Sequence, residues 1–141
     1  MVNALDRGRP LPARRRLAAR LAVAAARVLA ALPPRRIHTV LILIRTGATP
    51  ATPAQARAAR EAVVTVSVRC AGQGCLQRSL ATALLCRLGG TWPTWRTGVR
   101  MGPFRAHAWV EADGIPIGER EPAGYFTPTL TVPPRSRRAA R

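Results

Sequence analysis

The chain has 141 residues and a formal net charge of +17, and 48% of its residues are hydrophobic while only 4% are aromatic. This length suits one compact domain and excludes a second independent core, and the core must be built mainly from Leu, Val and Ala. Every basic residue is Arg; 13 of the 23 lie in residues 1–36 and 135–141 beside one acid, for a net charge of +12 there against +5 in residues 37–134. The basic character therefore belongs mainly to the ends.

Three cysteines, Cys70, Cys75 and Cys86, are an odd number, and no convincing export signal precedes them. We therefore expect free thiols in a reducing cytoplasm rather than a disulfide framework. The apolar run at residues 21–26 is cut by Arg27 and is far shorter than the roughly 20 residues that a membrane-spanning helix needs. The sequence thus predicts no membrane span.

Residues 1–36 are predicted to form a basic N-terminal extension that contains one amphipathic helix, from Pro12 to Leu32, ended by Pro33-Pro34. One face of this helix carries an apolar stripe at spacings of three and four residues, made of Leu17, Leu21, Ala24, Val28 and Leu32. We expect this stripe to pack on the domain that follows, and docking to a partner protein or to an anionic membrane surface remains an open alternative.

The domain itself is predicted to span residues 37–132, followed by a basic, unstructured tail at residues 133–141. Its first apolar run, at residues 40–44, is either a short strand or a buried helical turn, because periodicity alone does not separate the two. The residues at 52–55, Thr-Pro-Ala-Gln, form a helix start with a capping box, and we expect a helix to about Val68. Its inward-facing residues are Ala59, Val63 and Val66.

A flexible approach at residues 71–74 leads into a further predicted helix from Cys75 to Leu88, which Gly89-Gly90 ends. After it the hydrophobic period changes to two, which is typical of strands. The expected strands are residues 95–99, 104–111 and 115–119, with a hairpin turn at residues 112–114. Helices followed by an antiparallel sheet predict an α+β fold.

The candidate chemistry begins with Cys75, at the mouth of a predicted helix. A thiol there feels the positive end of the helix dipole, and the imidazole of His107 on the second predicted strand could take its proton. Together they would form an activated sulfur nucleophile. The backbone N–H of Cys75 would stabilise the oxyanion, with Gln73 as a candidate second donor.

An imidazole base needs a third group to orient it. Glu111 is excluded, because it lies four residues along the same strand as His107, about 13 Å away. A three-residue loop at 112–114 places Glu119 directly opposite His107, whereas a two-residue Asp113-Gly114 turn places Ala108 opposite that carboxylate. Glu119 is the preferred third member in either case, with Glu121 as its substitute.

Several motifs carry a resemblance to a known family. They are Cys-Leu-x-Arg-Ser-Leu at 75–80, Gly-Val-Arg at 98–100, Pro-Phe-x-Ala-His-Ala-Trp-Val-Glu at 103–111, Gly-Glu at 118–119 and Tyr-Phe-Thr-Pro at 125–128. This pattern resembles the freestanding leader peptidase of lasso-peptide biosynthesis, a member of the transglutaminase-like superfamily of papain-type Cys-His-Asp enzymes. The resemblance implies a nucleophile helix packed on a small antiparallel sheet, with Cys75 as nucleophile and His107 as base. The third member is commonly Asp, where this chain has Glu119.

The resemblance also implies what such an enzyme acts on. It implies removal of the leader from a ribosomally made lasso precursor peptide, often after a threonine that is second from the end of the leader. Family members of this short type work with a small leader-recognition protein, and an ATP-dependent cyclase related to asparagine synthetase then closes the macrolactam. No cofactor or metal is implied.

Less specific interpretations remain beside this one. The high net charge favours a basic nucleic-acid-binding module, although no nucleic-acid motif is recognisable, and a non-catalytic scaffold on the same fold is a third possibility. Trp109 is either a wall of the site or a substrate contact. Cys70 and Cys86 are expected to pack in the core, and the irregular spacing of the cysteines with His107 argues against a zinc site.

Overall fold

We describe the fold from a computed structural model, which describes residues 11–72 and 74–135. The helices are α2 (Ala13–Ala30), α3 (Pro34–Ile44), α4 (Pro53–Val66), α5 (Val68–Ala71) and α6 (Cys75–Leu88). The strands are β1 (Thr49–Pro50), β2 (Thr91–Trp92), β3 (Thr94–Arg100), β4 (Arg105–Ala112), β5 (Ile115–Pro116) and β6 (Thr127–Val132). Gln73 and the end of the expected tail, 136–141, lie outside the described residues.

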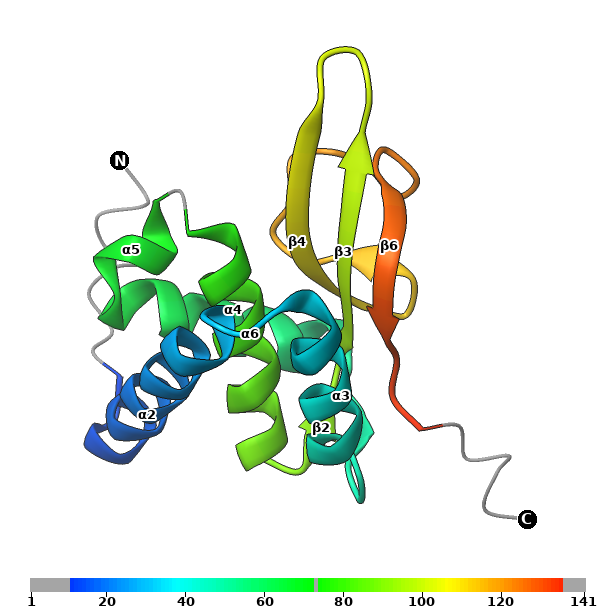
Figure 1. Ribbon diagram of the computed structural model, residues 1–141. Coiled ribbons are helices and arrows are strands. Elements are labelled where there is room, and N and C mark those ends of the chain that lie inside the picture. Colours follow the sequence, from blue (N-terminus) through cyan, green and yellow to red (C-terminus); the bar gives the residue numbers. More distant parts are fainter. Residues whose placement is uncertain (1–10, 73, 136–141) are drawn as a thin grey trace.

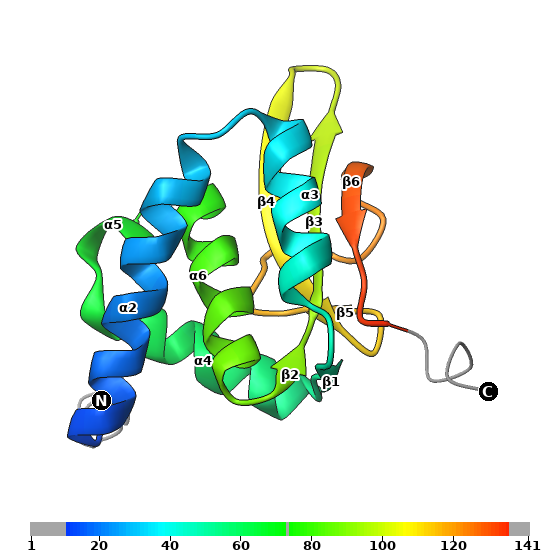
Figure 2. The ribbon, with the colours of Figure 1, turned by 60° about the horizontal axis from the view of Figure 1, so that its bottom comes forward.

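The molecule has a helical part and a sheet part, and α6 lies between them (Figures 1 and 2). The main sheet has four strands in the order β5-β4-β3-β6, all antiparallel, and β1 and β2 form a separate parallel pair. On the helical side, α2 and α4 pack on α6; on the other side β4 and β3 contact it. The predicted α+β fold, with the nucleophile helix packed on an antiparallel sheet, is confirmed.

The centre of the fold is α6, in which all eight residues from Ser79 to Cys86 are buried. Two tryptophans tie the sheet to its surroundings, and both are fully buried. The indole N–H of Trp95 donates to Ser79 Oγ at 3.0 Å, which links β3 to α6, and the indole N–H of Trp92 donates to the backbone oxygen of Val132 at 3.1 Å. Trp95 thus fixes α6 against the sheet, and Trp92 fixes β2 against the end of β6.

Helix α4 begins at its predicted capping signal, and α6 ends where the glycines after Leu88 predict. The Thr52 hydroxyl accepts from the Gln55 backbone N–H, and the Gln55 side chain accepts from the Thr52 N–H, which completes the expected capping box of α4. The bounds of α6 are those predicted, Cys75 and Leu88. The run at 40–44 is helical and forms the end of α3, which begins at Pro34. The predicted boundary between the N-terminal extension and the domain, after residue 36, therefore falls inside this helix.

The apolar face of the first helix is not the predicted one. Helix α2 buries three alanines, Ala19, Ala22 and Ala26, which belong to the same core as α6. Leu17, Leu21 and Val28 of the expected stripe lie on the opposite side and are 58–69% exposed. Both sets have helical spacing, so periodicity could not decide between them; the small Ala side chains let two helices approach closely.

The sheet differs from the prediction at its edges. Glu111 pairs with Pro116 and Ala112 with Ile115, so the hairpin has the two-residue Asp113-Gly114 turn rather than the three-residue loop. Both turn residues have positive φ, as such a tight turn requires. The returning strand ends at Pro116 instead of continuing to Glu119. Strand β6 was not expected, and α5 occupies the start of the approach that was expected to be flexible.

Candidate active site

Cys75 is the first residue of α6, and its side chain is half-buried. Arg78, one turn further along the helix, holds the preceding segment in place: its Nη1 donates to the backbone oxygens of Cys70 and Gly72 at 3.0 and 3.1 Å. The first intrahelical bond runs from the Arg78 N–H to the oxygen of Gly74, so the N–H of Cys75 has no intrahelical partner. Arg78 therefore fixes the segment that leads into the thiol.

His107 lies on β4 directly opposite Gly98 of β3. Its Nε2 makes a short hydrogen bond to Glu119 Oε1, and both side chains are largely buried. Since Nε2 faces the carboxylate, Nδ1 is the ring nitrogen that remains for the hydrogen bond between His107 and the Cys75 thiol. The structure thus joins His107 to Glu119 by a hydrogen bond and places the Cys75 thiol near enough to His107 for the two groups to shift each other's pKa.

The two titrating groups shift each other in the directions of an ion pair. The pKa of the Cys75 thiol is lowered, first by the hydrogen bond with His107 and then, against the opposing effect of burial, by a backbone hydrogen bond from Ala108 and the charges of His107 and Arg78. The pKa of His107 is raised to about 9, by the hydrogen bonds with Cys75 and Glu119 in that order. Thiolate and imidazolium therefore stabilise each other.

Glu119 reaches His107 by a route that strand pairing did not predict. The ladder register holds one step past β5, with the Ile117 N–H donating to the Val110 oxygen at 3.0 Å. The chain then bends at Gly118, whose φ is +67°, and a Cβ there would come within 2.6 Å of the Arg60 Nε. Gly118 thus permits both the bend and the close approach of Arg60, whose guanidinium lies near enough to interact with the Glu119 charge.

Two aromatic rings lie against the imidazole. The Trp109 ring stacks on His107 with centroids 5.9 Å apart, and Phe126 lies 5.2 Å from His107. A Cβ at Gly98 would come within 2.8 Å of Trp109, so this position must lack a side chain for the rings to close. Trp109 is buried and lies against the imidazole.

The remaining carboxylates nearby have partners other than His107. Trp109 Nε1 donates to Glu111 Oε2 at 2.8 Å, so Glu111 orients the tryptophan, which agrees with its exclusion as partner of His107. Glu121 lies 3.3 Å from Arg105 Nη1. Sequence reasoning missed the roles of Arg60, Gly98 and Phe126; two of these lie in the motifs at 98–100 and 125–128, which was the available signal.

The other two cysteines lie in the core, as expected. Cys70 and Cys86 are buried, and all three cysteines are unpaired. Burial raises the pKa of Cys86 to about 11, in contrast with Cys75. Within residues 11–72 and 74–135, no three His, Cys, Asp or Glu side chains gather as a metal site would require.

This site can be compared with known proteins. A family model described as the transglutaminase-like superfamily matches residues 19–131, which is more than half of the chain. The chain belongs to the transglutaminase-like superfamily. Members of that superfamily have cysteine-protease-like folds. The matched region of this chain begins inside α2, which packs with α6 in the core. The chain matches no curated protein and no solved structure.

Proposed function

We propose that this chain is a cysteine peptidase in which Cys75 is the nucleophile, His107 the general base and acid, and Glu119 the group that orients His107. The observation that carries the proposal is the hydrogen bond between His107 and Glu119, beside a Cys75 thiol whose pKa is lowered by His107 and which lies at the start of a buried helix. A nucleophile, a base within reach of it and a third group holding that base are the parts that covalent acyl transfer requires.

The reaction follows from the ion pair. The Cys75 thiolate attacks the scissile carbonyl carbon and forms a C–S bond while the carbonyl oxygen becomes an oxyanion. When the tetrahedral adduct collapses, the C–N bond breaks and the imidazolium of His107 gives its proton to the departing amine. Water, deprotonated by the now neutral His107, then attacks the thioester and releases the acid product and the thiol.

The oxyanion would be stabilised at the start of α6. The backbone N–H of Cys75 has no intrahelical partner and lies at the positive end of the helix dipole. Gln73 remains the proposed second donor, and it lies outside the described residues. Loss of one such donor typically costs about 3 kcal/mol in the barrier.

For the substrate we propose the leader segment of a lasso precursor peptide, cut with the help of a small leader-recognition protein before an asparagine-synthetase-like cyclase acts. The support is a resemblance to that family in the motifs at 75–80, 98–100, 103–111, 118–119 and 125–128. A cytoplasmic location is proposed with it, because all three cysteines are unpaired and a reducing compartment keeps Cys75 active.

The test uses the precursor peptide encoded by a neighbouring gene, incubated with this protein and the recognition protein and followed by mass spectrometry. Cys75→Ala should abolish release of the leader, and Cys86→Ala, which removes a buried thiol away from the site, should retain it. Continued cleavage by Cys75→Ala would overturn the peptidase assignment. Cleavage of other peptides but not of the precursor would leave a peptidase with a different substrate.

The alternative is a non-catalytic peptide-binding scaffold on the same fold. A thiol-reactive probe separates the two, since a low-pKa, accessible Cys75 reacts rapidly near neutral pH, and an inert thiol does not. Cys75→Ala should remove this labelling.

A further inference from the structure

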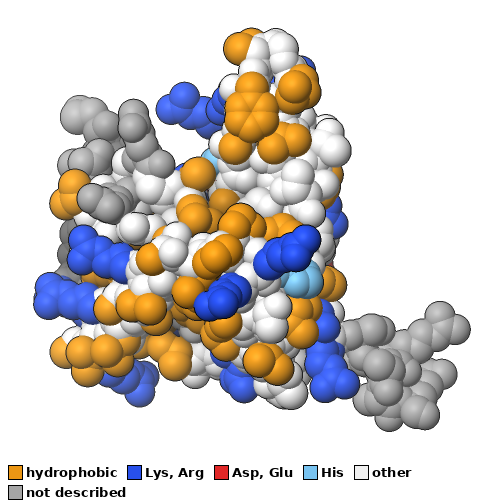
Figure 3. Space-filling view, in the orientation of Figure 1, with side chains coloured by type: hydrophobic (Ala, Val, Ile, Leu, Met, Phe, Trp, Pro, Cys, Tyr) orange, Lys and Arg blue, Asp and Glu red, His pale blue; other side chains and the backbone are white. Residues whose placement is uncertain are grey.

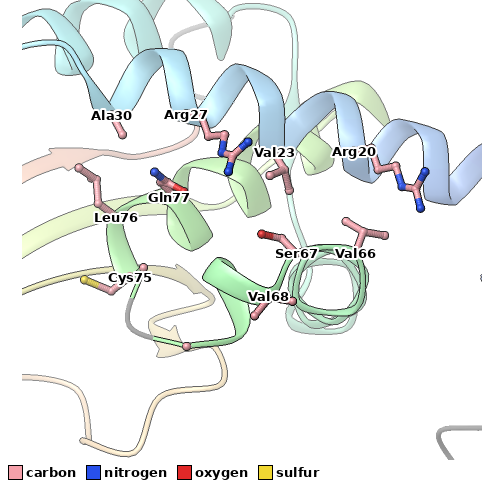
Figure 4. A pocket seen from close by; sticks show the side chains of 12 residues that line it. Arg20, Val23, Arg27, Ala30, Val66, Ser67, Val68, Cys75, Leu76 and Gln77 are labelled. Atoms are coloured by element: carbon pink, nitrogen blue, oxygen red, sulfur yellow. The ribbon is translucent and has the colours of Figure 1, made fainter.

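Beside Cys75 lies a groove that the proposed chemistry does not use. Its volume is about 1000 Å³, and it runs between α2 and the segment from the end of α4 to the start of α6 (Figure 4). Its apolar walls come from Val23, Val66, Val68 and Leu76. A cavity of this size accepts several residues of a peptide.

Two cations line the helix α2 side of the groove. Arg20 and Arg27 are seven residues apart on one flank of α2, which is about 10 Å along the helix axis. Among the residues that the structure describes, neither forms an ion pair with a carboxylate. Figure 3 shows arginines set among hydrophobic side chains on this side of the molecule, with no acidic side chain in view. The groove therefore holds two positive charges that the described chain does not neutralise.

A third observation concerns Gln77, on the first turn of α6. Its Oε1 is buried and has no hydrogen-bond partner in the described part of the chain, and the side chain lines the groove next to Arg27 (Figure 4). A buried acceptor without a donor is unusual in a folded protein, and a rotation of this side chain toward the groove would let a ligand N–H satisfy it. Peptides supply such donors along their backbone.

The groove adjoins the thiol without containing it. Cys75 lines one end, and in Figure 4 its sulfur points away from the cavity. Gly74, the residue before Cys75, also lines the groove and adds no side chain to it. The groove is thus placed to hold residues that flank the scissile bond, rather than the bond itself.

We infer that this groove binds an acidic stretch of the peptide substrate, with two carboxylates on Arg20 and Arg27 and apolar side chains on the opposite wall. The inference rests on the proposed peptidase function for its occupant. In an extended peptide, about three residues span the separation of the two arginines. The chain's own segment 1–10 carries two Arg and one Asp, so its net charge has the wrong sign for this groove.

The experiment measures binding of a fluorescent, extended peptide to the Cys75→Ala protein. One peptide carries two Glu residues about three positions apart, and its partner has Gln in their place. The double variant R20Q/R27Q is compared with R35Q/R36Q, which removes the same charge from exposed positions of α3. We expect R20Q/R27Q to bind the Glu peptide roughly five- to tenfold more weakly and the Gln peptide equally well, with no loss in R35Q/R36Q. Thermal unfolding of both double variants checks that they fold.

The outcomes separate this inference from the proposed function. If both double variants lose the same affinity, or neither does, the groove is not the acidic-peptide site, while cleavage of the precursor by the unaltered protein still supports the peptidase. If the unaltered protein cleaves no peptide but R20Q/R27Q still loses affinity for the Glu peptide alone, the proposed peptidase function is wrong. The inference that the groove binds an acidic peptide is then still supported. If a single-stranded oligonucleotide displaces the peptide and shows the same dependence on Arg20 and Arg27, the groove is a polyanion surface and the inference is wrong.

Discussion

The helical part and the sheet part of this protein differ sharply in charge. Residues 11–90 contain 13 Arg and one acid, a net charge of +12, whereas residues 91–135 contain five Arg and four acids, a net charge of +1. The thiol of Cys75 belongs to the basic part, and His107 and Glu119 belong to the nearly neutral part. In the proposed ion pair, each part therefore supplies a charge that stabilises its own member: cations beside the thiolate, and a carboxylate beside the imidazolium.

The largest effect should come from breaking this pairing at His107. We expect His107→Ala to lower the rate of cleavage by about 10⁴-fold, because both the activation of the thiol and the protonation of the leaving amine are lost. Alkylation of Cys75 at neutral pH should slow as well, since the hydrogen bond that lowers its pKa most is removed. Rapid alkylation in this variant would show that α6 alone activates the thiol.

A smaller effect is expected at Glu119, and it should change the pH dependence. The active pair needs Cys75 ionised and His107 protonated, so activity rises through the lowered pKa of the thiol and falls as the pH passes the His107 pKa of about 9. Glu119→Gln removes a group that raises the His107 pKa, so the alkaline limb should move to lower pH and the maximal rate should drop by about 10²-fold. An unchanged alkaline limb would contradict this role for Glu119.

The contact between the helical part and the sheet part can be weakened without changing Cys75, His107 or Glu119. Trp95→Phe removes the indole N–H that bonds to Ser79 and should lower the free energy of unfolding by about 1–2 kcal/mol. Ser79→Ala removes the other partner, and the double variant should be less destabilised than the sum of the two. Strict additivity in urea unfolding would mean that this bond does not couple the sheet to α6.

The smallest effect is expected at Arg60, a cation of the helical part that lies beside Glu119. Arg60→Gln should lower the cleavage rate by about threefold and shift the alkaline limb of the pH profile slightly, because the charge facing the carboxylate is lost. Arg57→Gln, an exposed change on the same helix, should alter neither. Equal effects of the two variants would show that only overall charge matters.

The elements with strong local signals could be predicted from the sequence. The capping box at Thr52 and the glycines after Leu88 gave the correct start of α4 and end of α6, because these signals act within one turn. The choice of Glu119 over Glu111 rested on strand geometry, and the structure does place Glu119 on His107.

Features that depend on contacts between residues far apart in the sequence could not be predicted from local signals. The buried face of α2 is set by the fit of Ala19, Ala22 and Ala26 on α6, and the sequence offered an equally periodic stripe opposite. The hairpin register depended on one residue in the turn, and the sequence left both turns open. The structure has the two-residue turn, in which Glu119 does not pair with His107 across the strands although their side chains are in contact. Arg60 lies 59 positions before Glu119, and nothing local to either residue indicates that they meet.

The alanine contact between α2 and α6 also limits how far the protein could be shortened. Ala19, Ala22 and Ala26 cover the outer side of the helix that carries Cys75. A truncated protein that starts at residue 37 would expose apolar side chains of α6 to water and would be prone to aggregate. The minimal folding unit is therefore larger than the stretch that holds the reactive groups.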